Sequence, residues 1–207
     1  SDSTFGGKKT TELSLEEKFA LETGMYHSGR FSLRSDGSIR KYNGLVTYVD
    51  DTVFVAATNP GIQAAIDYAK AGDTIYVAPG VFTEEVVINK PITLKGAGMG
   101  KSYIVGPKAK INNTNTVSLG GGSILEGFTI TREGNNLDDW AGNQRDQGVS
   151  FISDGNTLKN CEITGNRNGV YVNNRLNNKI INNIITNNRT GIQLCNNVTG
   201  LVVKDNV

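Results

Sequence analysis

The sequence of 207 residues is poor in several residue types, and each shortage narrows the choice of protein class. It has only two cysteines, Cys161 and Cys195. They fall in different columns of the repeat described below, so we do not expect a disulfide, and they say little about the redox compartment. The net charge is only +1 and the basic residues are dispersed, which gives no electrostatic footprint for nucleic acid or an anionic membrane. No apolar run approaches the roughly 20 residues that a membrane span needs, and no signal peptide is visible.

A repeat dominates what is present. In the last fifty residues the pattern recurs every 22 positions, so that residues 158–164 match residues 180–186 and residues 169–172 match residues 191–194. A short fixed period indicates one supersecondary unit stacked on copies of itself. Two or three brief strands with polar turns would fill such a unit, which predicts one coil of a parallel β-helix. The L-x-x-L-x-L framework of leucine-rich repeats is missing.

Asparagine is concentrated in the turns of residues 156–197. Asparagine tolerates left-handed backbone conformations and bonds its own turn, so stacked copies can form a ladder along a solenoid. The period places Phe128, Cys161, Asn183 and Asp205 in one column, which predicts an imperfect inward ladder there.

The first part of the chain, residues 1–58, is predicted to be a flexible arm followed by a small cap. Ser14 and Glu17 have the spacing of a helix capping box, and Gly24 suits the end of that short helix. The alternating segment 31–40, interrupted by Asp36-Gly37, predicts a β-hairpin. A cap is expected because the end of a solenoid exposes apolar core and backbone hydrogen-bonding groups.

A family resemblance lies in residues 59–98. The order I-Q-x-A-I, G-D-T-I-x-V, P-G-x-F-x-E and I-x-K-P-I-T-L-x-G resembles the opening of pectate-lyase-like β-helix proteins, a superfamily that includes pectin methylesterases and polysaccharide lyases. The resemblance implies an all-β, right-handed, single-stranded parallel β-helix over residues 59–207, behind a short helix and a small cap. It also implies acidic polysaccharide as the partner and an extracellular setting. These motif residues build the first helix and coils rather than an active site.

One insertion interrupts the period. Leu125 and Leu158 occupy the same place in the repeat but are 33 residues apart, so an 11-residue insertion must lie between Arg132 and Gly148. Insertions in a solenoid emerge on one face, often the binding face. The segment supplies acidic candidates for acid–base catalysis or for a cation such as calcium, a Trp that could lie against a sugar ring, and a basic residue for substrate binding. These candidates are Asp138, Asp139, Asp146, Trp140 and Arg145.

The repeat also predicts a column of charged residues. Counting back two residues from the glycine that opens each strand gives Asp146, Arg167 and Arg189. These residues should stack on successive coils, roughly 4.8 Å apart, where two guanidinium groups could clamp a uronate carboxylate. The competing interpretation is a packed surface loop with a salt-bridge ladder of little energetic worth.

The catalytic motifs of the superfamily's enzymes are absent from the sequence. The settings G-x-Q-D-T-L, F-I-F-G and L-G-R-P-W of pectin methylesterases do not occur, nor do G-H-G of polygalacturonases and W-I-D-H of pectate lyases. The only histidine, His27, precedes the coils. It therefore stays open whether the protein is an enzyme; if it is one, a polysaccharide lyase or a glycoside hydrolase is expected. No cofactor other than calcium is expected.

Two functions follow from these observations. The first is an extracellular or surface module that binds, and could cleave, acidic polysaccharide. The alternative is a non-catalytic structural β-helix of a surface-layer protein, an adhesin or a viral fibre on a virion. The sequence stops within a strand pattern at Val207, with no capping helix. Because an open sheet edge invites pairing, we expect a longer parent chain, or a homo-oligomer or larger assembly formed through this end.

Overall fold

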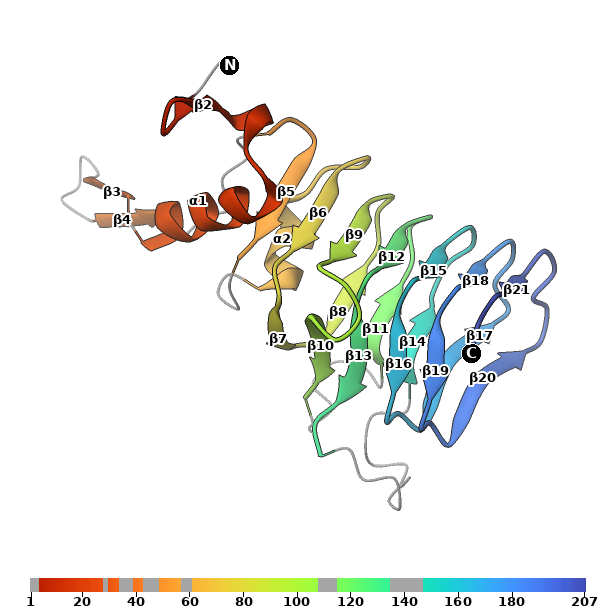
Figure 1. Cartoon of the computed structure of the whole chain (residues 1–207). Coiled ribbons are helices and arrows are strands. Elements are labelled where there is room, and N and C mark those ends of the chain that lie inside the picture. Colours follow the sequence, from red (N-terminus) through yellow and green to blue (C-terminus); the bar gives the residue numbers. More distant parts are fainter. Residues whose placement is uncertain are drawn as a thin grey trace.

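The fold is a solenoid of parallel strands with two helices at its N-terminal end (Figure 1). It is seen in a computed structural model that describes residues 4–27, 30–33, 39–42, 49–56, 61–107, 115–134 and 147–207. Three parallel sheets run along the solenoid, and the chain visits them in the same order in every coil. The predicted parallel β-helix is confirmed.

The strands divide among the three sheets as follows. The first sheet contains β5 (Thr52–Val55), β6 (Thr74–Val77), β9 (Thr93–Gly96), β12 (Ile124–Glu126), β15 (Thr157–Lys159), β18 (Lys179–Ile181) and β21 (Val202–Lys204). The second sheet contains β7 (Gly80–Thr83), β10 (Ser102–Gly106), β13 (Thr129–Arg132), β16 (Glu162–Thr164) and β19 (Ile184–Thr186). The third sheet contains β8 (Val86–Ile88), β11 (Asn115–Leu119), β14 (Gln147–Phe151), β17 (Asn168–Asn173) and β20 (Thr190–Cys195).

The strand register bears out the repeat. Leu158 pairs with Leu125 on one side and with Ile180 on the other, as the period predicts. Paired residues are 33 positions apart at β13 and β16 (Thr129 with Glu162) but 21 apart at β14 and β17 (Gln147 with Asn168). The additional residues therefore lie between β13 and β14, where the insertion was expected.

The core consists of rows of apolar side chains, one row from each sheet. Leu125 and Leu158 of the first sheet, Ile130 of the second, and Val149 and Val170 of the third are all 0% exposed. Because successive side chains of a strand point to opposite faces, the alternation of apolar and polar residues places one set inside and leaves the other on the surface. Burial of these rows supplies the main driving force for stacking the coils.

The residues that carry the family resemblance, 59–98, include helix α2 (Ile62–Tyr68) and the side chains that hold it in place. The helix packs its buried face against the first coils. Glu84 accepts hydrogen bonds from the backbone amides of Ile62 and Gln63, both at 2.9 Å, so its carboxylate caps the start of the helix. The Lys90 ammonium donates to the carbonyls of Ile66 and Ala69 at the other end, at 2.8 and 2.9 Å. The Gln63 side chain exchanges two hydrogen bonds with the backbone of Val87 in β8. The motif is thus a structural device, as the sequence indicated.

The N-terminal segment begins with a short antiparallel pair, β1 (Thr4–Phe5) and β2 (Lys8–Lys9), and a 3-10 turn, η1 (Thr10–Glu12). Helix α1 (Leu15–His27) follows, and its capping box is confirmed by reciprocal hydrogen bonds between Ser14 and Glu17 of 2.7 and 3.1 Å. The predicted end of this helix at Gly24 is wrong by one turn, because the helix continues to His27.

The hairpin and the packing of α1 complete this region. The hairpin is confirmed by antiparallel pairing of β3 (Arg30–Leu33) with β4 (Ile39–Tyr42). The Phe19 ring of α1 meets the Phe54 ring of β5 edge-on, with 6.0 Å between centroids, and Phe54 stacks on Tyr76 at 5.7 Å. The division at residue 58 stays a prediction, although β5 on its N-terminal side already pairs in parallel with β6.

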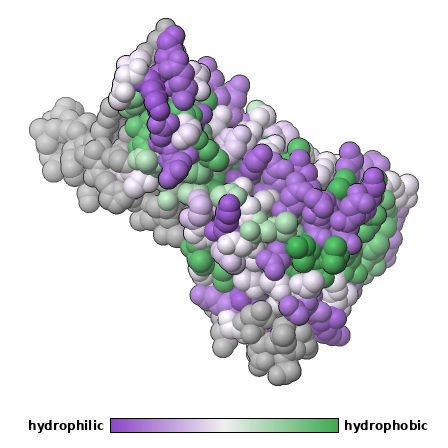
Figure 2. Space-filling view, in the orientation of Figure 1, coloured by the Kyte–Doolittle hydropathy of each residue, from purple (hydrophilic) through white to green (hydrophobic). Residues whose placement is uncertain are grey.

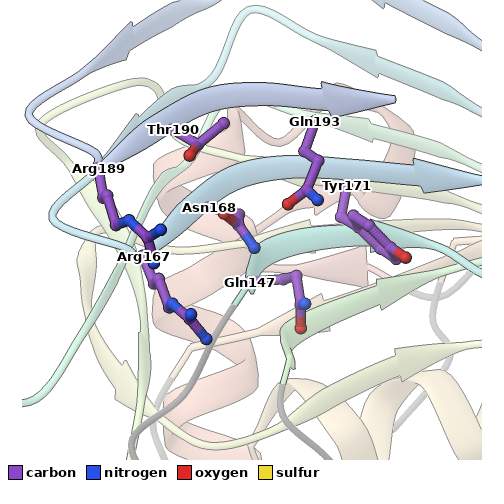
Figure 3. A pocket seen from close by; sticks show the side chains of 7 residues that line it. All are labelled: Gln147, Arg167, Asn168, Tyr171, Arg189, Thr190 and Gln193. Carbon is purple, nitrogen blue, oxygen red and sulfur yellow. The ribbon is translucent and has the colours of Figure 1, made fainter. Parts of the chain in front are cut away.

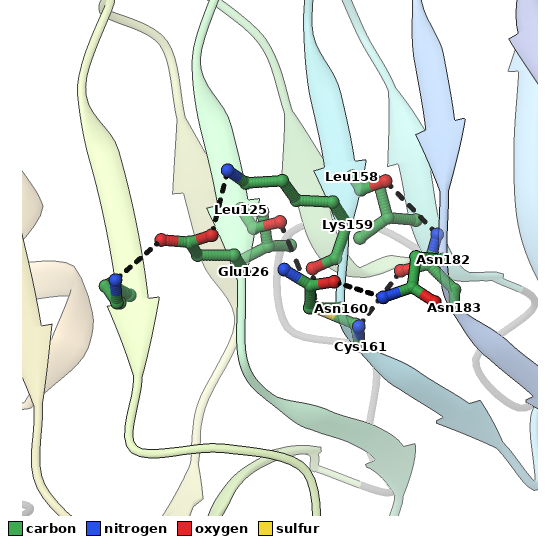
Figure 4. A network of polar contacts seen from close by, with 9 residues as sticks. Leu125, Glu126, Leu158, Lys159, Asn160, Cys161, Asn182 and Asn183 are labelled. Atoms are coloured by element: carbon green, nitrogen blue, oxygen red, sulfur yellow. Dashed lines mark hydrogen bonds and ion pairs between the residues drawn. The ribbon is translucent and has the colours of Figure 1, made fainter. Parts of the chain in front are cut away.

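Buried asparagines form the predicted inward ladder. The Asn183 side-chain oxygen accepts from the Cys161 amide at 3.0 Å, and its side-chain nitrogen donates to the Leu158 carbonyl at 3.1 Å (Figure 4). The next member of the column is Asn206, which bonds the Asn183 backbone amide at 3.0 Å; the assignment of Asp205 to this column is wrong. The turn between β20 and β21 holds one more residue than the period allows, because Asn173 pairs with Cys195 but Lys179 pairs with Val202. Asp205 therefore takes the left-handed conformation (φ 55°) of the residue before the inward-pointing asparagine.

The outer face of the first sheet carries a ladder of opposite charges. Glu126 forms ion pairs with Lys95 at 3.2 Å and Lys159 at 3.0 Å, one from each neighbouring coil (Figure 4). Partial burial opposes ionisation of Glu126, but the hydrogen bonds from Lys159 and Lys95 outweigh it and lower its pKa. This face is mainly hydrophilic over β12, β15 and β18 (Figure 2).

Candidate functional site

A pocket of about 450 Å³ opens at the start of the last strands of the third sheet. In the strand register Gln147, Asn168 and Thr190 are partners on successive coils, so the pocket runs across β14, β17 and β20. Figure 3 shows the side chains that line it. The lining residues are Gln147, Arg167, Asn168, Tyr171, Arg189, Thr190 and Gln193.

Two arginines form one end of this pocket. Arg167 precedes β17 and Arg189 precedes β20, and the Thr190 amide donates to the Arg167 carbonyl at 2.9 Å, which fixes the two turns one coil apart. Both guanidinium groups lie at the same end of the pocket, and the Arg189 side chain extends toward Arg167 (Figure 3). The structure therefore brings together the two arginines that the period placed in one column, and their role in binding stays a prediction.

An inward-pointing asparagine precedes each arginine and holds its turn; Asn166 is buried and Asn188 is half-buried. The Asn166 backbone amide donates to the Asn188 side-chain oxygen at 2.9 Å. The side-chain nitrogens of these asparagines donate to carbonyls of the second sheet, Asn166 to Thr164 at 2.9 Å and Asn188 to Ile163 at 2.8 Å. Since the asparagine points inward, the next residue of each Asn-Arg pair is directed to the surface. The Asn-Arg dipeptide that recurs 22 positions apart is the sequence signal for this arrangement.

Glycines at the strand starts let adjacent coils approach closely. A methyl group added at Gly169 would lie 2.6 Å from the Gly191 carbonyl oxygen and 2.8 Å from the Asn188 side-chain nitrogen. Neither glycine has a positive φ, so the requirement is for space and not for an unusual backbone conformation. The strand-opening glycine therefore sets the spacing between the turns that carry Arg167 and Arg189.

Tyr171 and Gln193 line the part of the pocket away from the arginines (Figure 3). They are register partners on β17 and β20. The Gln193 amide donates to the Cys195 sulfur at 3.7 Å. Burial, and secondarily a hydrogen bond with Cys195, raises the pKa of Tyr171, so its phenol stays neutral and can both donate and accept a hydrogen bond. Sequence reasoning missed both residues, although they occupy the variable position of the G-V-x-V pattern.

The described lining residues give the pocket a positive electrostatic character. They comprise two guanidinium groups, three amides, a hydroxyl and a phenol, with no aspartate or glutamate among them. For Arg189, no side-chain hydrogen bond or ion pair occurs with any described residue. Donors of this kind, beside an aromatic ring, suit a sugar bearing a carboxylate.

The five candidates of the insertion, Asp138, Asp139, Trp140, Arg145 and Asp146, lie outside the described residues, so their catalytic, substrate-binding and metal-binding roles stay predictions. Within the described part of the chain, no group of three or more His, Cys, Asp or Glu could hold a metal ion. The expectation of calcium therefore stays untested. No described helix is long and apolar enough to cross a membrane.

The comparison with protein families agrees with the fold. The family model described as Pectinesterase matches residues 45–181, which is more than half of the chain and includes β5 to β18. No curated protein matches. The match covers the braced helix, the coils as far as β18 and the turn of Arg167, and it extends the resemblance seen in the opening motif. The chain therefore belongs to the pectinesterase family of parallel β-helix proteins.

Proposed function

We propose that this protein binds the acidic polysaccharide of pectin across the outer face of the third sheet, with uronate carboxylates held at Arg167 and Arg189. The observation that carries the proposal is the convergence of two guanidinium groups from adjacent coils on one pocket. Membership of the pectinesterase family supports pectin as the class of ligand. An extracellular location fits such a ligand.

The shape of the pocket supports an extended ligand. From position 167 to position 171 a strand advances about 13 Å, and the rows from β14 to β20 span about 10 Å. The arginines lie at one end of this area, the side chains of Asn168 and Gln147 in its middle, and the Tyr171 ring at the other end (Figure 3). A sugar ring could therefore contact the aromatic face while its acid group reaches the guanidinium donors.

Binding is the activity that the described residues support. Cleavage or ester hydrolysis needs a nucleophile or a general base, and the described lining residues provide no carboxylate for that purpose. A reaction would have to use the acidic residues of the insertion, of which Asp146 comes directly before Gln147 in the chain. The Asp146→Ala variant, assayed for released methanol and for unsaturated uronate products, tests that part of the function.

The binding test compares polygalacturonate with a neutral glycan of similar length by calorimetry or affinity electrophoresis. We expect polygalacturonate to bind and Arg189→Gln to weaken it. The matched control is Lys179→Gln, which removes the same charge from an exposed position on β18 of the first sheet. No binding of polygalacturonate by the wild-type chain, or equal weakening by the control, would refute the proposal and favour the structural alternative.

A further inference from the structure

We infer that the arginine pair makes this pocket selective for unesterified uronate, so that the protein distinguishes the free acid of the polysaccharide from its methyl ester. The inference rests on the proposed function and specifies it: pectin is the class of ligand, and the free carboxylate is the group that is read. Arg167 and Arg189 are the residues that determine this specificity.

The fold sets the backbone positions of the two arginines. Asn166 is 0% exposed, and its bond to Asn188 ties together the turns that carry the arginines. The backbone bond from Thr190 to Arg167 adds a second tie. The two cationic side chains therefore leave the solenoid about 4.8 Å apart, before any ligand arrives. A fixed arrangement of this kind lowers the entropic cost of binding.

The charge of the pocket favours an anionic ligand. The Arg189 guanidinium brings a positive charge to one end of the pocket, and an anion bound beside it gains a favourable electrostatic interaction. No described lining residue carries a negative charge. Arg189 makes no side-chain hydrogen bond or ion pair with a described residue, so its donors are available to a ligand. The pocket therefore favours a ligand that brings its own negative charge.

A uronic acid and its methyl ester differ in what they offer to a guanidinium group. A carboxylate accepts two parallel hydrogen bonds from one guanidinium, and such charge-assisted bonds are roughly twice as strong as neutral ones. A methyl ester has no charge and retains only neutral acceptors. Replacing one charge-assisted interaction by a neutral one costs on the order of tenfold in affinity. Lysine, as a compact point charge, cannot reproduce the bidentate geometry.

The other side chains of the pocket do not discriminate between the acid and the ester. Asn168, Gln193 and Tyr171 are neutral. The raised pKa of Tyr171 keeps its phenol protonated in alkaline solution. These side chains can contact hydroxyl groups and the ring, which are the same in the acid and in the ester. General affinity and selectivity for the acid therefore depend on different residues and can be separated by mutation.

The experiment measures the affinities for oligogalacturonates of one length, either unesterified or fully methyl-esterified, by calorimetry at low ionic strength. For the wild type we expect the free acid to bind about tenfold more tightly, and this ratio to fall as salt screens the charges. Arg189→Gln should lower the ratio to about threefold or less, with little change in affinity for the ester. Arg189→Lys should give an intermediate ratio, and Lys179→Gln should leave it unchanged.

Several results would overturn the inference. If the wild type binds acid and ester equally, the selectivity is refuted while pectin binding stands. If Arg189→Gln and Arg167→Gln both keep the full ratio, the assignment of the selectivity to these arginines is refuted. If neither oligomer binds, the selectivity and the proposed function fail together. A sulfated oligosaccharide of the same length tests which anion is preferred, because guanidinium groups also donate hydrogen bonds to sulfate. Tighter binding of that sugar would assign the pocket to sulfate rather than uronate.

Discussion

Substituting Gly169 by alanine tests whether the close approach of adjacent coils is required. The new Cβ would lie 2.6 Å from the Gly191 carbonyl oxygen, a distance at which the backbone must shift. The matched control is Gly191→Ala, the same change one coil further along, where the nearest atom is a methyl carbon of Ile185 at 3.7 Å. Because neither glycine has a positive φ, alanine introduces no dihedral strain at either position.

The magnitude follows from two opposing effects. Overpacking against backbone costs about 1–3 kcal/mol, while replacing glycine by alanine in a compatible conformation gains about 0.4–1 kcal/mol through the unfolded state. We therefore expect Gly169→Ala to lower the free energy of unfolding by about 1–2 kcal/mol, and Gly191→Ala to leave it unchanged or raise it by about 0.5 kcal/mol. For a chain of this size the first value corresponds to a melting temperature about 2–8 °C lower.

The assay is urea denaturation followed by circular dichroism, with the melting temperature as a second measure. Relief of the clash requires β20 to move away from β17, which would also separate Arg167 from Arg189 and weaken polygalacturonate binding. The reasoning is refuted if Gly169→Ala is as stable as the wild type. It is refuted equally if Gly191→Ala destabilises the chain as much as Gly169→Ala does.

Three further predictions concern other parts of the molecule. Glu84→Ala removes the carboxylate that caps helix α2, and we expect the free energy of unfolding to fall by about 2 kcal/mol, seen as a lower urea midpoint; an unchanged midpoint would contradict the bracing role. The pKa of Glu126 is lowered in the folded state from 4.5, so its contribution to stability is present above that pH and is lost as pH falls through the folded pKa. The difference in urea midpoint between wild type and Glu126→Gln should therefore be largest near neutral pH and disappear as the pH falls through the lowered folded pKa, whereas a constant difference would argue against the lysine pairs. Burial raises the pKa of Cys161 to about 12, so a thiol reagent should label Cys195 in the native protein and Cys161 only after unfolding. Rapid labelling of both thiols at neutral pH would show that the core opens there.

Much of the fold could be predicted from the sequence because a solenoid is a local structure. Each coil contacts only its neighbours, so a repeat along the chain directly indicates what stacks on what. The pairing of Leu158 with Ile180 and the position of the insertion were both predicted this way and confirmed. The repeat gives a wrong prediction where a turn changes length. One additional residue between β20 and β21 places Asn206, not Asp205, in the inward column.

The candidate site was predictable only in part, for a related reason. The period placed Arg167 and Arg189 in one column, and the structure brings them to one pocket. Tyr171 and Gln193 were not identified, because their position in the strand shows only that they point outward. Whether an outward side chain lines a pocket depends on the course of the backbone around it, and a sequence pattern does not describe that course.

By itself, the sequence determined the stacking of this protein: its repeat, the residues of its core and the column of arginines follow from the alternation of apolar and polar positions over a fixed period. The tertiary structure decided which outward side chains converge. Glycines without side chains let the coils approach at the strand starts, and inward-pointing asparagines turn the following arginines to the surface. Convergence depends on these contacts between coils, which are distant in sequence, and for that reason only the folded chain reveals the pocket.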